Sequence, residues 1–173
     1  PVFGSGPFPS GRCYDLVEIK RIIDRASENH IEVMPEFDLP GHNMSLVKLY
    51  PSMRDPEDKS YEVSVQGYTE NTINPAMPDT LPVLENIIDD LCRVFPGEYI
   101  HLGADEIAPD AWTKSPAIDM LRSENNLKNS KDVASWFINK LSKRVESNNK
   151  KTAAWQVAED GRHQDHKISK LLF

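Results

Sequence analysis

Two short apolar segments of this chain run into acidic or basic side chains, and this arrangement limits the folds that the chain can form. Residues 99–106 (YIHLGADE) end in Asp105 and Glu106, and residues 31–42 (IEVMPEFDLPGH) end in His42. A buried carboxylate costs several kcal/mol unless it is paired or used. We therefore interpret both segments as strands whose ends contribute polar groups to one site.

Helical patterns alternate with these strand-like segments. We predict helices from Asp15 to about Asn29, from Asp79 or Thr80 to about residue 94, and over about 116–123 and 131–147, and strands at 31–38, 99–106 and 151–157. Strands separated by helical runs of this length favour parallel βαβ units, so the predicted fold class is α/β. Residues 39–78 are predicted to form a long loop, and loops of this length are usually functional or disordered.

Composition excludes several classes of partner. The net charge of −7 and the lack of a basic cluster argue against binding to nucleic acid or to an anionic membrane, whereas a neutral sugar fits this charge better. No apolar run approaches 18 residues, so we expect no membrane insertion. Cys13 and Cys92 are expected at opposite ends of the fold, beyond disulfide reach, and are therefore predicted to be free thiols.

Three motifs together resemble a known enzyme family. Residues 35–42 (PEFDLPGH), 101–106 (HLGADE) and 153–156 (AAWQ) are similar, in the same order, to glycoside hydrolase family 20, the β-N-acetylhexosaminidases. Trp112 lies six residues after Glu106, a spacing that also fits the family. The resemblance runs from about residue 12 to residue 160, and residues 71–78 (NTINPAMP) are similar to the bacterial chitobiase branch.

The resemblance implies a (β/α)8 TIM barrel, which needs about 250 residues, whereas the chain has 173. We therefore expect residues 1–173 to be one partial catalytic domain, truncated at both ends, that contains roughly strands 3 to 5 with their helices. The remainder of the parent barrel would then be its partner. We expect the isolated segment to be inactive, and its open sheet edges to pair or aggregate.

The resemblance also implies a mechanism. In retaining, substrate-assisted hydrolysis the 2-acetamido oxygen of the sugar attacks C1, and no enzyme carboxylate does. Glu106 would be the general acid and then the base, while Asp105 would hold the acetamide N–H and stabilise the oxazolinium intermediate. The implied substrates are carbohydrates with a terminal β-linked N-acetylhexosamine, either GlcNAc or GalNAc, such as chitooligosaccharides. No cofactor and no metal ion is implied.

Three further residues are candidates for substrate binding, each with a simpler alternative. Trp155 would form a wall around the acetamido methyl group, or it is an ordinary core tryptophan. His42 would orient Glu106 and tune its acidity, or it caps a helix or bonds a backbone carbonyl. Trp112 would stack on a sugar, or it pins its own loop.

The remaining polar residues of the motifs are expected to support the site. Asp38 and Glu36 are predicted to bond loop amides rather than to act on the substrate, and His101 to be a satisfied core histidine. Ala104 stands where many family members have glycine, and Val157 stands where they have glutamate.

Two other classes of function stay open. One is a non-catalytic carbohydrate-binding or structural module with the same fold. The other is a metal-dependent TIM-barrel hydrolase, because His42, His101, Asp38 and Asp105 could form a histidine and carboxylate set, although no HxH or HExxH spacing is present. The resemblance further implies a secreted, periplasmic or lysosomal location rather than a cytoplasmic one. Asn43 begins a glycosylation sequon that we predict to be unused, because a glycan there would obstruct the site.

Overall fold

The computed structural model describes residues 13–64, 67–108 and 110–155. The chain divides into two compact units, residues 1–33 and 34–173, and each is considered by itself. The expectation of one domain over residues 1–173 stays a prediction.

In the first unit, the described residues form the helix α1 (Leu16–Glu28). Asp15 caps it, because its Oδ1 accepts a hydrogen bond from the backbone N–H of Glu18 at 2.8 Å. The Glu18 carboxylate accepts in return from the N–H of Asp15 at 3.0 Å. This reciprocal capping box satisfies two backbone donors at the start of the helix, and it confirms the predicted helix start.

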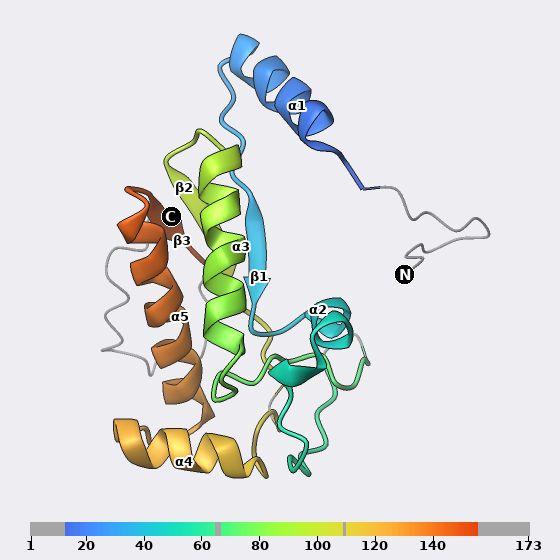
Figure 1. Cartoon of the computed structure of the whole chain (residues 1–173), viewed down its shortest axis with the longest axis vertical. Coiled ribbons are helices and arrows are strands. Elements are labelled where there is room, and N and C mark those ends of the chain that lie inside the picture. The colour runs from blue at the N-terminus through green and yellow to red at the C-terminus, as the bar shows by residue number, and fades with distance from the viewer. Residues whose placement is uncertain (1–12, 65–66, 109, 156–173) are drawn as a thin grey trace, which may run out of the picture. The chain divides into compact units, whose positions relative to one another are not determined.

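The second unit contains a parallel three-stranded sheet with helices between its strands (Figure 1). Its strands lie in the order β1 (Glu36–Leu39), β2 (Tyr99–Gly103), β3 (Lys151–Ala153). Its longer helices are α3 (Thr80–Val94), α4 (Pro116–Asn125) and α5 (Ser130–Ser147). The α/β class is confirmed, whereas the numbering of these strands as 3 to 5 of a barrel stays a prediction.

Helices α3 and α5 run side by side and pack on one face of the sheet (Figure 1). Apolar residues at helical spacing on both helices, and alternate residues of the strands, form this core: Leu39, Leu84, Ile88, Ile100, Leu102, Phe137, Leu141 and Val145. Arg144 of α5 also donates a hydrogen bond from Nε to Oδ1 of Asp89 of α3 at 2.8 Å.

Because strand side chains alternate between the two faces, the sheet also has a polar face. Ile100 and Leu102 of β2 face the helices, so His101 and Gly103 point to the opposite side. By the same alternation, Glu36 and Asp38 of β1 share that opposite face. The polar residues of the sequence motifs therefore lie on the side of the sheet away from α3 and α5.

The strands are shorter than predicted, and β1 is the clearest case. It begins at Glu36 rather than residue 31. Pro35 has no N–H to donate to a ladder, although its carbonyl accepts a hydrogen bond from the N–H of His101 at 3.0 Å.

Strands β2 and β3 are shorter than predicted because they end early. Strand β2 ends at Gly103, where the backbone leaves the extended conformation: φ is 65° at Gly103 and 76° at Ala104. Strand β3 ends at Ala153 rather than residue 157, and residues 156 and 157 lie outside the described residues.

The predicted loop over residues 39–78 contains two short helices that the sequence patterns did not indicate. They are α2 (Met44–Leu49) and the 3₁₀ helix η1 (Pro51–Met53). Cys13 and Cys92 are both free, as predicted. Among the described residues, no helix is both long and apolar enough to cross a membrane.

Candidate active site

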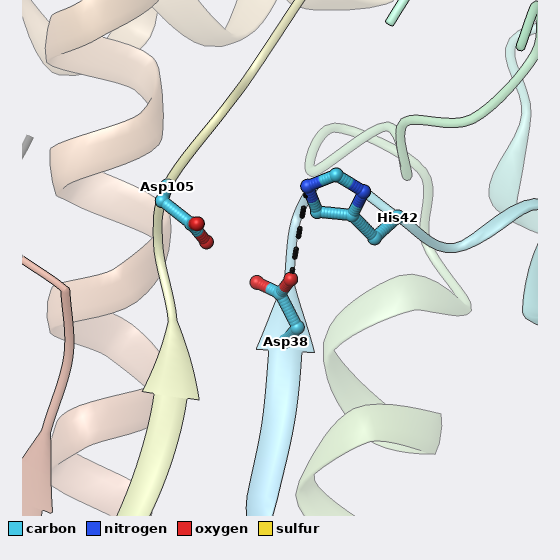
Figure 2. Close-up of side chains that lie close together, drawn as sticks. All are labelled: Asp38, His42 and Asp105. Atoms are coloured by element: carbon cyan, nitrogen blue, oxygen red, sulfur yellow. Dashed lines mark ion pairs between the residues drawn. The ribbon is translucent and has the colours of Figure 1, made fainter. Parts of the chain in front are cut away.

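Four of the predicted site residues come together beyond the carboxyl ends of β1 and β2. Figure 2 shows the carboxyl groups of Asp38 and Asp105 facing each other from the ends of these two strands, with the imidazole of His42 beside Asp38. The Nε2 atom of His42 lies 3.9 Å from Oδ2 of Asp38 and 3.3 Å from Oε2 of Glu106. One imidazole nitrogen thus lies near carboxylates from two strand ends, and the predicted convergence of these residues is present in the structure.

Asp38 and Asp105 form a carboxyl pair in which the pKa of Asp38 is raised. Burial, followed by repulsion from Asp105, raises the pKa of Asp38 to about 6, while His42 acts in the opposite direction. The Oδ1 atoms of both residues are buried and have no hydrogen-bond partner within the part of the chain that the structure describes. A proton held by Asp38 can bridge the two carboxyl groups and so reduce the repulsion between them.

The backbone at the end of β2 makes room for this pair. A Cβ atom added to Gly103 would lie 1.7 Å from Oδ1 of Asp38, so any larger residue would displace that carboxyl group. Gly103 also has φ of 65°, in the left-handed region that favours glycine. Sequence reasoning did not identify Gly103 as a site residue, although its place between His101 and Asp105 in the motif was a usable signal.

The loop that carries His42 is held in place from both sides. Gly41 packs against the backbone of Asp105 and Glu106, since a Cβ there would lie 3.6 Å from the carbonyl oxygens of both residues. The Asn43 side chain is buried and donates from Nδ2 to the carbonyl of Asp38 at 2.6 Å and to that of Gly41. The sequence did not predict that Asn43 anchors this loop, because the sequon indicated Asn43 only as a possible glycan acceptor.

Trp155, Glu36 and His101 form a second cluster on the same polar face of the sheet. The indole Nε1 of Trp155 donates to Oε1 of Glu36 at 2.7 Å, and its ring lies 4.8 Å from the His101 ring. His101 is buried, and its Nδ1 accepts from the N–H of Gly103 at 3.1 Å, as expected for a satisfied core histidine. Trp155 is 52% exposed, so among the described residues it does not have the surroundings of a core tryptophan.

The two acids that were expected to bond loop amides have other partners. Asp38 contacts His42 and Asp105, and Glu36 accepts from the indole of Trp155. The physical reason is their position: both lie within β1, whose ladder already uses the nearby backbone donors, so their side chains reach across the sheet face instead.

Trp112 lies in a different environment. Its side chain is buried, and Nε1 donates to the carbonyl of Ile73 at 3.1 Å, which ties the loop after β2 to the loop before α3. This geometry favours the loop-pinning role. A cavity of about 190 Å³ lies beside it, lined mainly by residues between 54 and 74. Neither Asp105 nor Glu106 lines this cavity, so we place the candidate site at the strand ends.

Three of these residues could also hold a metal ion. One ligand atom each from Asp38, His42 and Asp105 lies within 4.8 Å of the others, and a mixed imidazole and carboxylate set suits zinc or iron. His101, the fourth residue considered for such a set, instead accepts from Gly103 and packs on Trp155.

Comparison with known proteins decides the family. The sequence profile described as glycosyl hydrolase family 20, catalytic domain, matches residues 7–170. The chain belongs to glycosyl hydrolase family 20. The resemblance inferred from the three motifs is therefore confirmed.

Relatives in family 20 align along most of the chain. A β-hexosaminidase from Vibrio furnissii is 32% identical over 152 residues, covering 87% of this chain and 25% of the relative. The β-hexosaminidase subunit beta of Sus scrofa is 30% identical, covering 91% and 29%.

Solved structures of the family have the same fold. The family 20 exo-β-N-acetylglucosaminidase from Vibrio harveyi, in complex with N-acetylglucosamine, matches with a TM-score of 0.80 and 30% identity over 83% of this chain and 22% of that one. The Flavobacterium johnsoniae chitobiase matches with a TM-score of 0.73, 29% identity, and coverage of 82% and 22%. The chain thus spans about a quarter of the length of these relatives.

Proposed function

We propose that the chain is part of the catalytic barrel, roughly strands 3 to 5, of a β-N-acetylhexosaminidase. The enzyme would remove terminal, non-reducing, β-linked GlcNAc or GalNAc, for example from chitooligosaccharides, outside the cytoplasm. Relatives named β-hexosaminidase, exo-β-N-acetylglucosaminidase and chitobiase support this substrate class. The observation that carries the proposal is the adjacent pair Asp105 and Glu106 at the end of β2, with His42 at 3.3 Å from Glu106.

Glu106 is the group that moves a proton in this mechanism. In the first step the acetamido oxygen bonds to C1, the glycosidic C1–O bond breaks, and the proton of Glu106 passes to the leaving oxygen. In the second step Glu106 takes a proton from water as the water oxygen bonds to C1 and the oxazolinium ring opens. The contact with His42 limits where the carboxyl group of Glu106 can point, which suits a group that must reach first the leaving oxygen and then the attacking water beside C1.

Asp105 has the geometry for the second role. Its Oδ1 atom is buried and has no hydrogen-bond partner among the described residues, and an acetamide N–H would supply the donor that such an acceptor lacks. Asp38 supports it, because a proton on Asp38 can be shared with Asp105 and limits the repulsion between the two groups. Asp105 can then hold the acetamide N–H and stabilise the positive charge that develops on the oxazolinium ring.

The experiment that tests this function uses the full-length protein and the variant Asp105→Ala. We expect the wild type to hydrolyse an aryl β-GlcNAc glycoside and to leave the matching 2-hydroxy glucoside essentially intact. The variant should lose catalysis and should bind a stable thiazoline mimic of the oxazolinium much more weakly. Equal turnover of both glycosides, or an unchanged affinity for the mimic, would contradict the assignment.

A metal-dependent hydrolase is the second candidate, because Asp38, His42 and Asp105 lie close enough to share an ion. Prolonged treatment of the full-length protein with a chelator separates the two. Substrate-assisted hydrolysis predicts unchanged activity toward the GlcNAc glycoside, whereas loss of activity that zinc restores would favour the metal.

A non-catalytic module with the same fold is the third candidate, and a turnover assay distinguishes it from the enzyme. A full-length protein that binds the GlcNAc glycoside without hydrolysing it would be such a module. The 173-residue chain expressed alone is expected to be inactive in either case, because it spans about a quarter of its relatives.

A further inference from the structure

The side chain of Trp155 reaches from the end of β3 across β2 to β1. Its backbone N–H donates to the carbonyl of Gly103 at 2.7 Å, which fixes the residue against the end of β2. Its indole Nε1 donates to Oε1 of Glu36, the first residue of β1, at 2.7 Å. One residue is thus held by hydrogen bonds to the adjacent strand β2, through its backbone, and to the more distant strand β1, through its side chain.

His101 lies between these two attachments. It is level with Glu36 in the β1–β2 register and with Ala153 in the β2–β3 register. Its buried ring meets the indole of Trp155 at a centroid distance of 4.8 Å and an angle of 59°. Glu36 and His101 therefore restrict the indole from two directions, by a hydrogen bond at its edge and by a ring contact.

The hydrogen-bond pattern indicates that the indole N–H of Trp155, rather than His101, donates to Glu36. The Nδ1 atom of His101 already accepts from the N–H of Gly103 at 3.1 Å, so in the neutral ring this nitrogen is an acceptor. The same nitrogen lies 3.4 Å from Oε1 of Glu36. Because both atoms are then acceptors, no hydrogen bond forms between them. The N–H of Trp155 supplies one, and a hydrogen bond to a charged acceptor is stronger than one between neutral groups.

We propose that Glu36 is a positioning residue that fixes the plane of the Trp155 indole and thereby sets the size of the N-acyl group that the site accepts. This inference rests on the proposed function, in which Trp155 forms a wall around the acetamido methyl group. Trp155 is 52% exposed, so among the described residues packing alone leaves half of its surface unrestrained. Without the Glu36 bond the indole can rotate about its side-chain torsions, which widens the space beside the acyl methyl.

The test compares two substrates in the full-length protein. Aryl β-glycosides of N-acetyl- and N-butyryl-glucosamine with the same leaving group are assayed with the wild type, Glu36→Ala and Glu36→Gln. Glu36→Ala should lower kcat/KM for the N-acetyl substrate about tenfold and lower it much less for the N-butyryl substrate. Glu36→Gln keeps an acceptor oxygen and should retain the wild-type ratio within about threefold. Glu124→Ala, an exposed change on α4, is the control and should leave both values unchanged.

A double-mutant cycle tests whether Glu36 acts through the indole N–H. In a Trp155→Phe background no N–H is present, so adding Glu36→Ala should leave the ratio between the substrates unchanged. Thermal unfolding of each variant shows whether it is folded, and the Glu36→Gln and Trp155→Phe arms remain informative if Glu36→Ala is not.

Two outcomes would overturn the inference while leaving the proposed function intact. One is an equal loss for both substrates in Glu36→Ala. The other is a further change of the ratio when Glu36→Ala is added to Trp155→Phe. A wild type that fails to hydrolyse the N-acetyl substrate would instead overturn the proposed function, and this inference with it.

Discussion

The Nε2 atom of His42 lies 3.3 Å from Oε2 of Glu106, which joins the loop after β1 to the segment after β2. The same nitrogen lies 3.9 Å from Oδ2 of Asp38. The imidazole thus lies beside two carboxylates with different proposed roles. Glu106 transfers the proton, and Asp38 supports Asp105.

The contact between His42 and Glu106 predicts a catalytic cost for His42→Asn. Asparagine tolerates the left-handed backbone of this position, where φ is 57°, so the loop should keep its path. It is too short to reach Glu106 from the same position, and kcat should fall about tenfold or more for substrates with poor leaving groups. His30→Asn, another position with positive φ but on a different unit, is the control and should retain full activity. Wild-type kcat in His42→Asn would show that the contact does not serve catalysis.

The raised pKa of Asp38 predicts a stability difference that depends on pH. The pKa is about 6 in the folded protein against 3.8 for the ordinary group, so the folded state holds this proton more tightly. The stability that the proton contributes is fully present below about pH 4 and is lost as the pH rises through about 6. Asp38→Asn cannot ionise. The free energy of unfolding of this variant, minus that of the wild type, should therefore increase between about pH 4 and pH 7, by at most about 3 kcal/mol.

Denaturant unfolding of the full-length protein at several pH values measures that difference. A difference that stays constant across this range would mean that Asp38 titrates alike in the folded and unfolded states.

The close approach of Asp38 to Gly103 of β2 predicts that Gly103→Ala strongly lowers activity. The added methyl would meet Oδ1 of Asp38 at 1.7 Å and force that carboxyl group away from Asp105. Gly67→Ala is a matched control, because Gly67 also has positive φ, of 81°, but no atom lies within 4 Å of its added methyl. Both variants should lose about 1 kcal/mol of stability from backbone strain. Gly103→Ala should lose more than Gly67→Ala, because its added methyl would also lie 2.6 Å from the Cα atom of Asp38. Only Gly103→Ala should lose kcat/KM, by about a hundredfold. Equal kcat/KM in the two variants would contradict the steric argument.

The sequence indicated those parts of the fold whose signals are local. Asp15 and Glu18 satisfy each other at the start of α1, and the apolar spacing that includes Leu84 and Ile88 identified α3. Strand ends were harder to predict, because they depend on backbone conformation. Strand β2 ends where Gly103 and Ala104 both have positive φ, and the φ of 76° at Ala104 is strained for alanine, which fits the expectation that many relatives have glycine there.

The convergence of four polar residues could be predicted from the sequence, whereas the role of Gly103, the Asn43 loop anchor and the contacts of Trp112 could not. Order along the chain and the polarity of parallel strands placed Asp38, His42, Asp105 and Glu106 together. Nothing local indicated that Glu36 would bond the indole of Trp155, 119 positions away in the chain. That bond depends on the β1–β2–β3 register, which a single sequence does not specify.

The central claim is that Glu106 transfers a proton to the leaving oxygen, and Glu106→Gln in the full-length protein tests it most directly. Glutamine keeps the shape of the side chain but has no transferable proton. The measurement compares kcat of the variant with that of the wild type for two β-GlcNAc glycosides, one with a poor leaving group and one with an activated aryl leaving group. The account predicts a fall on the order of 10²-fold or more for the first and a smaller fall for the second, because an activated aryl leaving group needs little protonation. Equal losses for both substrates would contradict the assignment of Glu106 as the acid.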